Sequence, residues 1–420
     1  MHIELINTGS ELMLGRVLNT HQQWICRQLA DLGYTVNRQV AIDDSAPAIQ
    51  AAVRDALGSA DLTIVTGGLG PTSDDRTRDL IAGLLGRPLH EDPAVVAHIE
   101  SFFDSRKRPM PASTRVQAMV PQGATVLMNA HGTAPGLAME APASGASSAP
   151  RMLIMLPGPP RELRPMFSEQ VTPLIAQRFP LASPFVCRTL KTTGLGESLV
   201  EEKIAGPLQS LVAAGLELGY CARIGEVDVR FVAHGGSAQQ TISEAEQIVR
   251  GLMGDMVFAV DDEQLEMTVV RLLAERKQTV ALAESCTGGA IANRITNVPG
   301  ASAVFMAGLV TYSNAAKQKF LGVRSETLAT HGAVSEAVAR EMAEGARREA
   351  GTDFAVSVTG IAGPSGGSAE KPVGTAWMAV ASGDGTVARR RLNPFDRETF
   401  KSVTSQHALD LLRRQILGLA

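Results

Sequence analysis

Short apolar runs that end in glycine turns recur along this chain, and they constrain its fold more than any other feature. Three runs pass directly into such turns: residues 3–6 into Thr8-Gly9-Ser10, residues 62–65 into Thr66-Gly67-Gly68, and residues 151–156 into Pro157-Gly158-Pro159-Pro160. Helical apolar spacing follows the first turn, over residues 19–32. Strand, glycine turn and helix in repetition are typical of a parallel sheet with helices on both faces. We expect the three turns to meet at one rim, because ligands bind at the carboxyl ends of such strands.

The same alternation returns late in the chain, with strands expected at residues 279–283, 354–359 and 374–381. A chain of 420 residues is too long for one ordinary core. We therefore predict an α/β protein in which two three-layer α/β domains are joined by a small α+β domain. The predicted limits are 1–168, 169–258 and 259–420. Residues 141–150 (APASGASSAP) are predicted to form an exposed hairpin or loop insertion.

Charge and cysteine content exclude several classes of protein. With 39 Lys and Arg against 43 Asp and Glu, the net charge is −4, and no long basic run appears. This argues against nucleic acid as the main ligand. The four cysteines are dispersed, which favours reduced thiols and a cytoplasmic location. Neither a signal peptide nor a run of 18 apolar residues is apparent, so we expect no membrane association.

The motif Glu284-Ser285-Cys286-Thr287-Gly288-Gly289 follows an apolar strand and opens a helix. Its hydroxyl and backbone N–H groups could hold a phosphate, although an ordinary helix-capping turn has the same composition. A serine nucleophile needs a base, and His331 and His407 lie outside the glycine turns. Burial would lower the pKa of Lys317 and make its neutral amine a base, whereas a solvated helix lysine would not serve.

Five motifs together resemble the C-terminal domain of the CinA family: ESCTGG, PG-x-S at residues 299–302, VTYSN-x-x-K at 310–317, VTGIAGP at 358–364 and KPVGT at 371–375. The resemblance covers residues 261–420 and implies deamidation of nicotinamide mononucleotide without a cofactor. It also implies Ser302 as nucleophile, Lys317 as general base and Tyr312 as an aid to proton transfer.

The resemblance further implies a set of substrate-binding residues. They are Ser285, Cys286, Thr287, Gly288, Gly289, Thr359, Gly360, Gly363 and, for the nucleotide phosphate, Arg397. Ser285, Thr359 and the adjacent glycines are the expected oxyanion donors. The segment around Arg397 lacks the glycine usual in the family. On chemistry alone Cys286 is a rival nucleophile, since a helix N-terminus lowers the pKa of a thiol.

In the first half, the strongest motif is TGGLGPTSDDRT at residues 66–77. Successive glycines allow close approach of a phosphate or ring, and adjacent aspartates can hold a divalent cation. An aspartate-capped glycine turn would look the same. TGSELMLG at residues 8–15, Asp43-Asp44, GTAPG at 132–136 and PGPPRE at 157–162 accompany the motif in order.

This series resembles the molybdopterin-binding fold at the N-terminus of CinA proteins. The resemblance implies cleavage of ADP-ribose to AMP and ribose 5-phosphate with a divalent metal (Mg, Mn or Co) and potassium. Asp43, Asp74 and Asp75 are the expected metal ligands. The other expected site residues are Ser10, Glu11, Asn19, Gly67, Gly68, Gly70, Thr72, Thr133, Pro159 and Glu197.

The sequence therefore predicts a bifunctional hydrolase of pyridine nucleotides. Its expected partners are nicotinamide mononucleotide and ADP-ribose, with no direct nucleic acid and no membrane. Two alternatives remain: a deamidase with a non-catalytic N-terminal binding module, and a competence or recombination accessory protein that acts through protein partners. A homodimer is implied by the resemblance alone.

Overall fold

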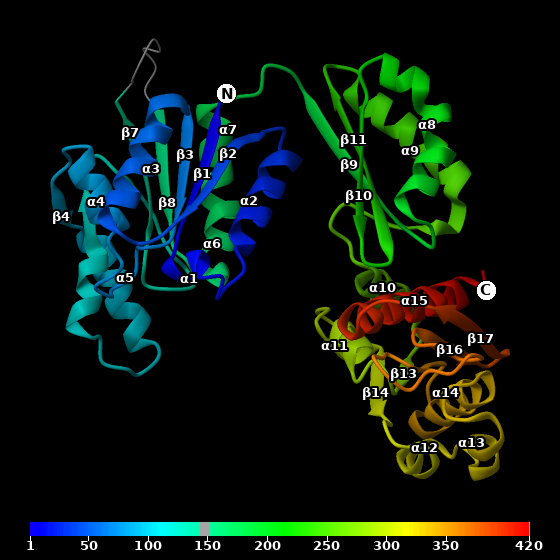
Figure 1. The fold of residues 1–420 in the computed structure, drawn as a ribbon. Coiled ribbons are helices and arrows are strands. Elements are labelled where there is room, and N and C mark those ends of the chain that lie inside the picture. The colour runs from blue at the N-terminus through cyan, green and yellow to red at the C-terminus, as the bar shows by residue number, and fades with distance from the viewer. Residues whose placement is uncertain (143–150, 420) are drawn as a thin grey trace. The chain divides into compact units, whose positions relative to one another are not determined.

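The N-terminal sheet has the strand order β2-β1-β3-β8-β7-β6 in a computed structural model that describes residues 1–142 and 151–419 (Figure 1). The first four strands in that order are parallel, and β7 and β6 are antiparallel additions. The strands are β1 (Ile3–Thr8), β2 (Val36–Ile42), β3 (Leu62–Thr66), β6 (Thr125–Leu127), β7 (Gly136–Ala141) and β8 (Arg151–Leu156). The α/β class is as predicted, but the sheet is mixed, not purely parallel.

Helices cover both faces of this sheet because its central strands are apolar on both sides. Leu5 and Ile64 pack into one core while their neighbours Ile6 and Val65 pack into the other. One face carries α2 (Thr20–Asp31), α6 (Pro160–Met166) and α7 (Thr172–Arg178). The other carries α3 (Ala46–Ser59), α4 (Thr77–Leu84) and α5 (Pro93–Asp104).

Several short elements complete the N-terminal part. They are α1 (Ser10–Met13), the paired strands β4 (Leu89–Glu91) and β5 (Met119–Pro121), the 3-10 helix η1 (Ala112–Ala118) and the π-turn η2 (Phe167–Val171). Most of the predicted insertion at 141–150 lies outside the described residues.

The first compact unit is Met1–Phe185, and the second is Val186–Ala420. The predicted limit at residue 168 is therefore too early. Val171 and Ile175 are buried in the core beneath β1 and β8, so the segment that holds them belongs to the first unit. A helix of mixed composition gives no sequence signal for which sheet it will cover.

The second unit begins with a four-stranded sheet in the order β10-β11-β9-β12. Its strands are β9 (Phe185–Thr193), β10 (Glu217–Arg223), β11 (Glu226–His234) and β12 (Val257–Val260). Helices α8 (Glu197–Ala213) and α9 (Ala238–Met253) pack on the sheet and bury a shared apolar cluster, and η3 (Gly254–Met256) leads into β12.

A second mixed sheet, β14-β13-β15-β16-β17, follows in the same unit. β13 is parallel to β14 and β15, whereas β16 and β17 are antiparallel. The strands are β13 (Val280–Glu284), β14 (Phe305–Val310), β15 (Phe354–Gly360), β16 (Thr375–Ser382) and β17 (Gly385–Leu392).

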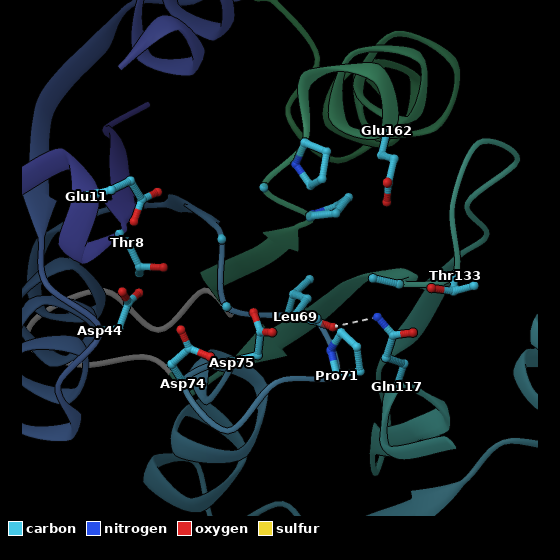
Figure 2. Close-up of a pocket in the computed structure, with 18 residues that line it drawn as sticks. Thr8, Glu11, Asp44, Leu69, Pro71, Asp74, Asp75, Gln117, Thr133 and Glu162 are labelled. Carbon is cyan, nitrogen blue, oxygen red and sulfur yellow. Dashed lines mark hydrogen bonds between the residues drawn. The ribbon is translucent and has the colours of Figure 1, made fainter. Parts of the chain in front are cut away.

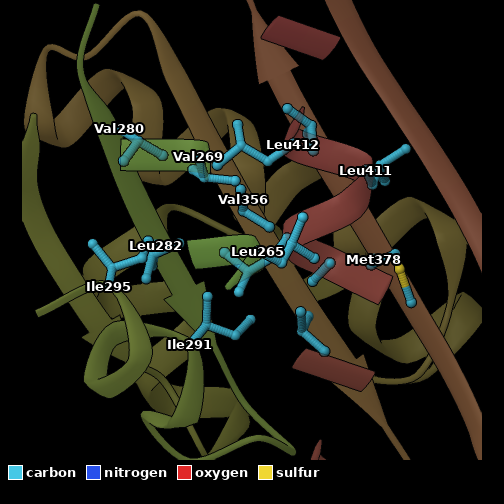
Figure 3. Close-up of a cluster of buried hydrophobic side chains, with 14 of the residues drawn as sticks. Leu265, Val269, Val280, Leu282, Ile291, Ile295, Val356, Met378, Leu411 and Leu412 are labelled. Atoms are coloured by element: carbon cyan, nitrogen blue, oxygen red, sulfur yellow. The ribbon is translucent and has the colours of Figure 1, made fainter. Parts of the chain in front are cut away.

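Two helical layers enclose this sheet. Leu265, Ile291 and Leu412 come from three helices on one face and meet Leu282 and Val356 of the sheet (Figure 3). These helices are α10 (Leu265–Arg276), α11 (Ala290–Thr296) and α15 (Arg397–Leu417). The opposite layer contains α12 (Asn314–Leu321), α13 (Ser325–His331) and α14 (Glu336–Ala350), and η4 (Ala301–Ala303) precedes β14.

None of the helices in the described part of the chain combines the length and apolar character needed to cross a bilayer.

Candidate functional site

Lys317 and Ser285 meet at the carboxyl end of β13, which lies between β14 and β15 in the second α/β sheet. Ser285 directly follows that strand, and Lys317 lies on α12, which begins four residues after β14 ends. The lysine Nζ is 3.0 Å from Ser285 Oγ, 2.8 Å from the carbonyl oxygen of Thr311 and 3.3 Å from that of Tyr312. Only 1% of Lys317 is exposed. A hydroxyl and a buried amine therefore form one hydrogen-bonded pair.

The surroundings of Lys317 favour its neutral form. Burial lowers the pKa of its amine. No ion pair between described residues involves this lysine. Two of its three hydrogen-bond partners are carbonyl oxygens, which can only accept. In its neutral form the amine has two protons for the Thr311 and Tyr312 carbonyls and a lone pair that can accept the Ser285 hydroxyl proton, whereas the protonated form donates to all three oxygens.

Ser302, the expected nucleophile, lies elsewhere. It is exposed in η4, before β14, whereas Lys317 follows the other end of that strand. The backbone N–H of Val280, where β13 begins, donates to Val304, which places this turn at the amino end of the sheet. A six-residue strand spans about 20 Å. Ser302 and Lys317 therefore lie at opposite ends of β14 and do not form the predicted pair, and the hydroxyl in contact with Lys317 is that of Ser285.

Glu284 already occupies the turn that was expected to bind phosphate. Its carboxylate is buried and accepts N–H groups of Gly289 (3.0 Å), Ile291 (3.2 Å) and Ala292 (2.8 Å). The N–H of Gly288 donates to the Ser285 carbonyl. The first N–H groups of α11 are thus not available to a substrate anion or oxyanion. The motif contains Glu284, but nothing in the sequence indicated that its side chain would turn back onto the helix.

Of the other residues in this turn, Cys286 and Thr287 are buried, and the two glycines lie at the protein surface. Cys286 is buried, and desolvation raises its pKa to about 12, which argues against a thiolate nucleophile. Thr287 is also buried. Gly288 and Gly289 have φ angles of 65° and 95° and reach the surface, as a turn built from left-handed residues requires.

Arg397 and Tyr312 contact each other beside Lys317, whose amine bonds the Tyr312 carbonyl, and their predicted roles stay predictions. Arg397 donates to the carbonyl oxygen of Gly363 (2.8 Å) and to the Tyr312 hydroxyl (3.0 Å). Tyr312 is 63% exposed. Thr359, by contrast, is buried and donates to the carbonyl of Ala333. Its hydroxyl proton is therefore used within the fold, and its role toward substrate stays a prediction.

The close packing around residue 360 leaves no room for a side chain. A Cβ there would stand 2.9 Å from the Phe400 ring, 2.9 Å from the Thr375 carbonyl oxygen and 3.1 Å from Cys286 Sγ. Glycine is needed at this position because α15 packs closely on the end of β15.

In the first unit, the turns after β1, β3 and β8 enclose a cavity of about 420 Å³. This is the rim predicted from the sequence. Expected residues that line the cavity are Glu11, Gly67, Gly68, Gly70, Asp74, Asp75, Thr133 and Pro159. Other lining residues from the same predicted motifs are Thr8, Gly9, Asp44, Leu69, Pro71, Ala134, Pro157, Gly158 and Glu162, and Gln117 is the lining residue that no motif contained.

Carboxylates dominate the cavity, and its lining includes no Lys, Arg or His. Glu11, Asp44, Asp74 and Asp75 lie on one side, and Glu162 lies across from them (Figure 2). Among the described residues, no three His, Cys, Asp or Glu side chains are grouped closely enough to hold a metal ion by themselves. A bound cation would need oxygen atoms of a ligand or water in addition.

Asp44, not Asp43, belongs to this cavity. Its carboxylate accepts from the backbone N–H (2.7 Å) and hydroxyl (2.9 Å) of Ser10. Asp43 accepts the N–H of Ser45, and this hydrogen bonding lowers the pKa of Asp43. The sequence identified the pair, but the side-chain direction at the end of β2 decides which member faces the cavity.

Three other expected residues have supporting or separate roles. Asn19 caps α2 by accepting the N–H of Gln22. Thr72 donates its hydroxyl to Asp75 and so orients that carboxylate. Glu197 belongs to the second unit, where it accepts the N–H of Ala222, and its place in the N-terminal site stays a prediction.

Three family models match successive parts of the chain. Family models match residues 4–177 ("Probable molybdopterin binding domain"), 187–259 ("Damage-inducible protein CinA KH domain") and 262–416 ("CinA C-terminal domain"). A CinA-like protein of Akkermansia muciniphila is 46% identical over 410 residues, which cover 97% of this chain and 96% of the relative. The chain belongs to the CinA family.

Two solved structures of CinA relatives cover about a third of the chain. The competence/damage inducible protein CihA of Agrobacterium tumefaciens is 44% identical, with a TM-score of 0.35, and covers 35% of this chain and 91% of its own. A CinA superfamily protein of Klebsiella pneumoniae is 36% identical, with a TM-score of 0.36, and covers 37% and 96%.

Residues 187–259, the KH-type part of this CinA chain, carry a G-x-x-G pattern at the end of a helix. KH domains clamp a nucleotide backbone with a G-x-x-G loop. Within residues 187–259 that pattern occurs at 251–254, where it forms the last turn and end of α9. That the chain binds no nucleic acid directly stays a prediction from its charge.

Proposed function

We propose that the C-terminal domain deamidates nicotinamide mononucleotide to nicotinic acid mononucleotide and ammonia. The observation that carries the proposal is the 3.0 Å contact between the Ser285 hydroxyl and the buried Lys317 amine. A serine is a weak nucleophile until a base takes its proton, and a buried lysine is one of the few side chains that can do so near neutral pH. The nicotinamide substrate is inferred from the likeness to CinA proteins.

The reaction follows from this pair. Ser285 Oγ attacks the carboxamide carbon as Lys317 accepts the hydroxyl proton, and the carbonyl oxygen becomes negatively charged. Lys317 then returns the proton to the leaving nitrogen, which departs as ammonia and leaves an ester on Ser285. A water molecule, deprotonated by Lys317, attacks the ester and releases the carboxylic acid. To stabilise the negative oxygen we assign the hydroxyl of Tyr312, which accepts from Arg397 and can donate its own proton.

Ammonia release by the full chain tests this function. The purified protein should liberate ammonia from nicotinamide mononucleotide and form one equivalent of the acid. EDTA should leave the rate unchanged, because this scheme has no metal-dependent step. Lack of ammonia release, or a rate that chelation abolishes and added metal restores, would contradict the proposed mechanism.

For the N-terminal domain we propose metal-dependent hydrolysis of ADP-ribose to AMP and ribose 5-phosphate. Five carboxylates and no basic side chain line its cavity, so a pyrophosphate could enter only with cations that offset the repulsion. Asp44, Asp74 and Asp75 are the candidate ligands of a divalent ion (Mg, Mn or Co), and potassium could supply further charge. AMP formation that requires metal would support this activity.

Two other functions would give different results in the same assays. A non-catalytic N-terminal module would bind ADP-ribose and form no AMP with any of these metals. An accessory role in competence or recombination would require a protein partner and would not depend on either site. Homodimer formation is part of the proposal and is measurable by light scattering.

A further inference from the structure

Two cationic side chains near the Ser285–Lys317 pair, Arg397 and Lys401, have no carboxylate partner among the described residues. Arg397 donates only to the Gly363 carbonyl and the Tyr312 hydroxyl, both neutral groups. Lys401 makes no hydrogen bond or ion pair with any residue in the described ranges. Its Nζ lies 3.7 Å from the position that a Cβ on Gly288 would occupy. An unpaired ammonium group thus stands over the turn that carries Ser285.

The first turns of α15 hold both cations in place. Residues four apart share one face of a helix, so Arg397 and Lys401 point the same way. Asp396 caps the helix by accepting the N–H groups of Glu398 (3.0 Å) and Thr399 (3.1 Å). Phe400 is fully buried against the end of β15, which fixes the rotation of the helix.

We propose that Lys401 binds the phosphate monoester of the substrate and makes the site select a nucleotide over its uncharged nucleoside. The inference rests on the proposed deamidase function and adds a specificity residue to it. The N-terminal N–H groups of α11 are held by Glu284, so side chains must supply the counter-charge for the phosphate. Arg397 offers a forked guanidinium group, and Lys401 offers a compact charge one turn further along the same face of α15.

The test compares two substrates, nicotinamide mononucleotide and nicotinamide riboside, which differ by the phosphate. Lys401→Gln in the full chain should raise KM for the nucleotide about tenfold or more and lower kcat much less, because a charge-assisted hydrogen bond is worth at least about 1.4 kcal/mol. Its kcat/KM for the riboside should stay within about twofold of wild type. Lys401→Arg should restore most of the affinity. Lys203→Gln, on the exposed face of α8, removes the same charge elsewhere and should change neither substrate.

The outcomes separate this inference from the function on which it rests. If wild type releases no ammonia from either substrate, the deamidase proposal fails and this inference fails with it. If wild type is active but Lys401→Gln keeps its KM for the nucleotide, only the role of Lys401 is refuted. An equal loss toward both substrates would show that Lys401 supports the fold and does not recognise phosphate.

Discussion

Replacing each of two serines by alanine distinguishes the pair seen in the structure from the pair suggested by family resemblance. Ser285→Ala removes the hydroxyl that contacts Lys317 at the carboxyl end of the strands, and Ser302→Ala removes an exposed hydroxyl at their amino end. We expect Ser285→Ala to lower kcat for ammonia release by about 10³-fold or more, equivalent to about 4 kcal/mol of transition-state stabilisation. Ser302→Ala should retain activity within about twofold, as most exposed substitutions do.

The stability of the variants shows that this loss is catalytic. In Ser285→Ala, the Lys317 amine keeps the carbonyl oxygens of Thr311 and Tyr312 as acceptors. The variant therefore loses one hydrogen bond, about 1 kcal/mol, and should unfold at nearly the same urea concentration as wild type. A double variant, Ser285→Ala with Lys317→Arg, should be scarcely slower than either single variant, because the two residues act as one unit.

Steady-state ammonia release, coupled to glutamate dehydrogenase and run beside the urea titrations, measures all of these quantities. The reasoning is refuted if Ser302→Ala abolishes turnover while Ser285→Ala stays near wild type. It is also refuted if Lys317→Arg remains active, since a guanidinium group stays charged and cannot accept the proton.

Three further predictions concern protonation, the N-terminal cavity and the buried thiol. Burial lowers the pKa of Lys317, and only its neutral amine is a base. For ammonia release, kcat/KM should therefore rise with pH through that lowered pKa and reach a plateau below pH 10.5. A profile that rises only near pH 10.5, the ordinary lysine pKa, would contradict this. By linkage, the protonated amine destabilises the fold at low pH, so stability should increase with pH above the folded pKa, and Lys317→Met should remove that increase. Asp75→Ala should lower metal-dependent AMP formation by about 10²-fold and leave ammonia release unchanged, whereas Asp43→Ala, outside the cavity, should change neither rate. If the two variants lower AMP formation equally, the cavity is not the site of ADP-ribose cleavage. Cys286, with a pKa of about 12, should not react with iodoacetamide at pH 8 until the protein unfolds, whereas the exposed Cys221 should react at once. If mass spectrometry shows rapid labelling of Cys286 in the folded protein, this thiol is again a candidate nucleophile.

Local sequence features predicted much of the fold. The strand at Arg151–Leu156 has the limits expected from its apolar run, and the strands expected at 279–283 and 354–359 occur at Val280–Glu284 and Phe354–Gly360. A buried central strand needs a continuous apolar run, and a turn with positive φ needs glycine, so both leave local signals. The antiparallel edge strands have no such local signal, and neither does the membership of residues 169–185 in the first unit. Both depend on which face or edge of a sheet the rest of the fold leaves uncovered.

The sequence by itself determined which residue types stand at the strand ends: Ser285 after β13, Lys317 beyond β14, and aspartates beside the glycines of the first domain. Only the tertiary structure decided which of them meet. Parallel pairing of β13 and β14 brings Lys317 to Ser285, 32 residues away, and keeps it from Ser302 although that residue is closer in sequence. Sequence spacing limits how far apart two side chains can be, whereas the direction of the strand between them decides whether they meet at one edge of the sheet.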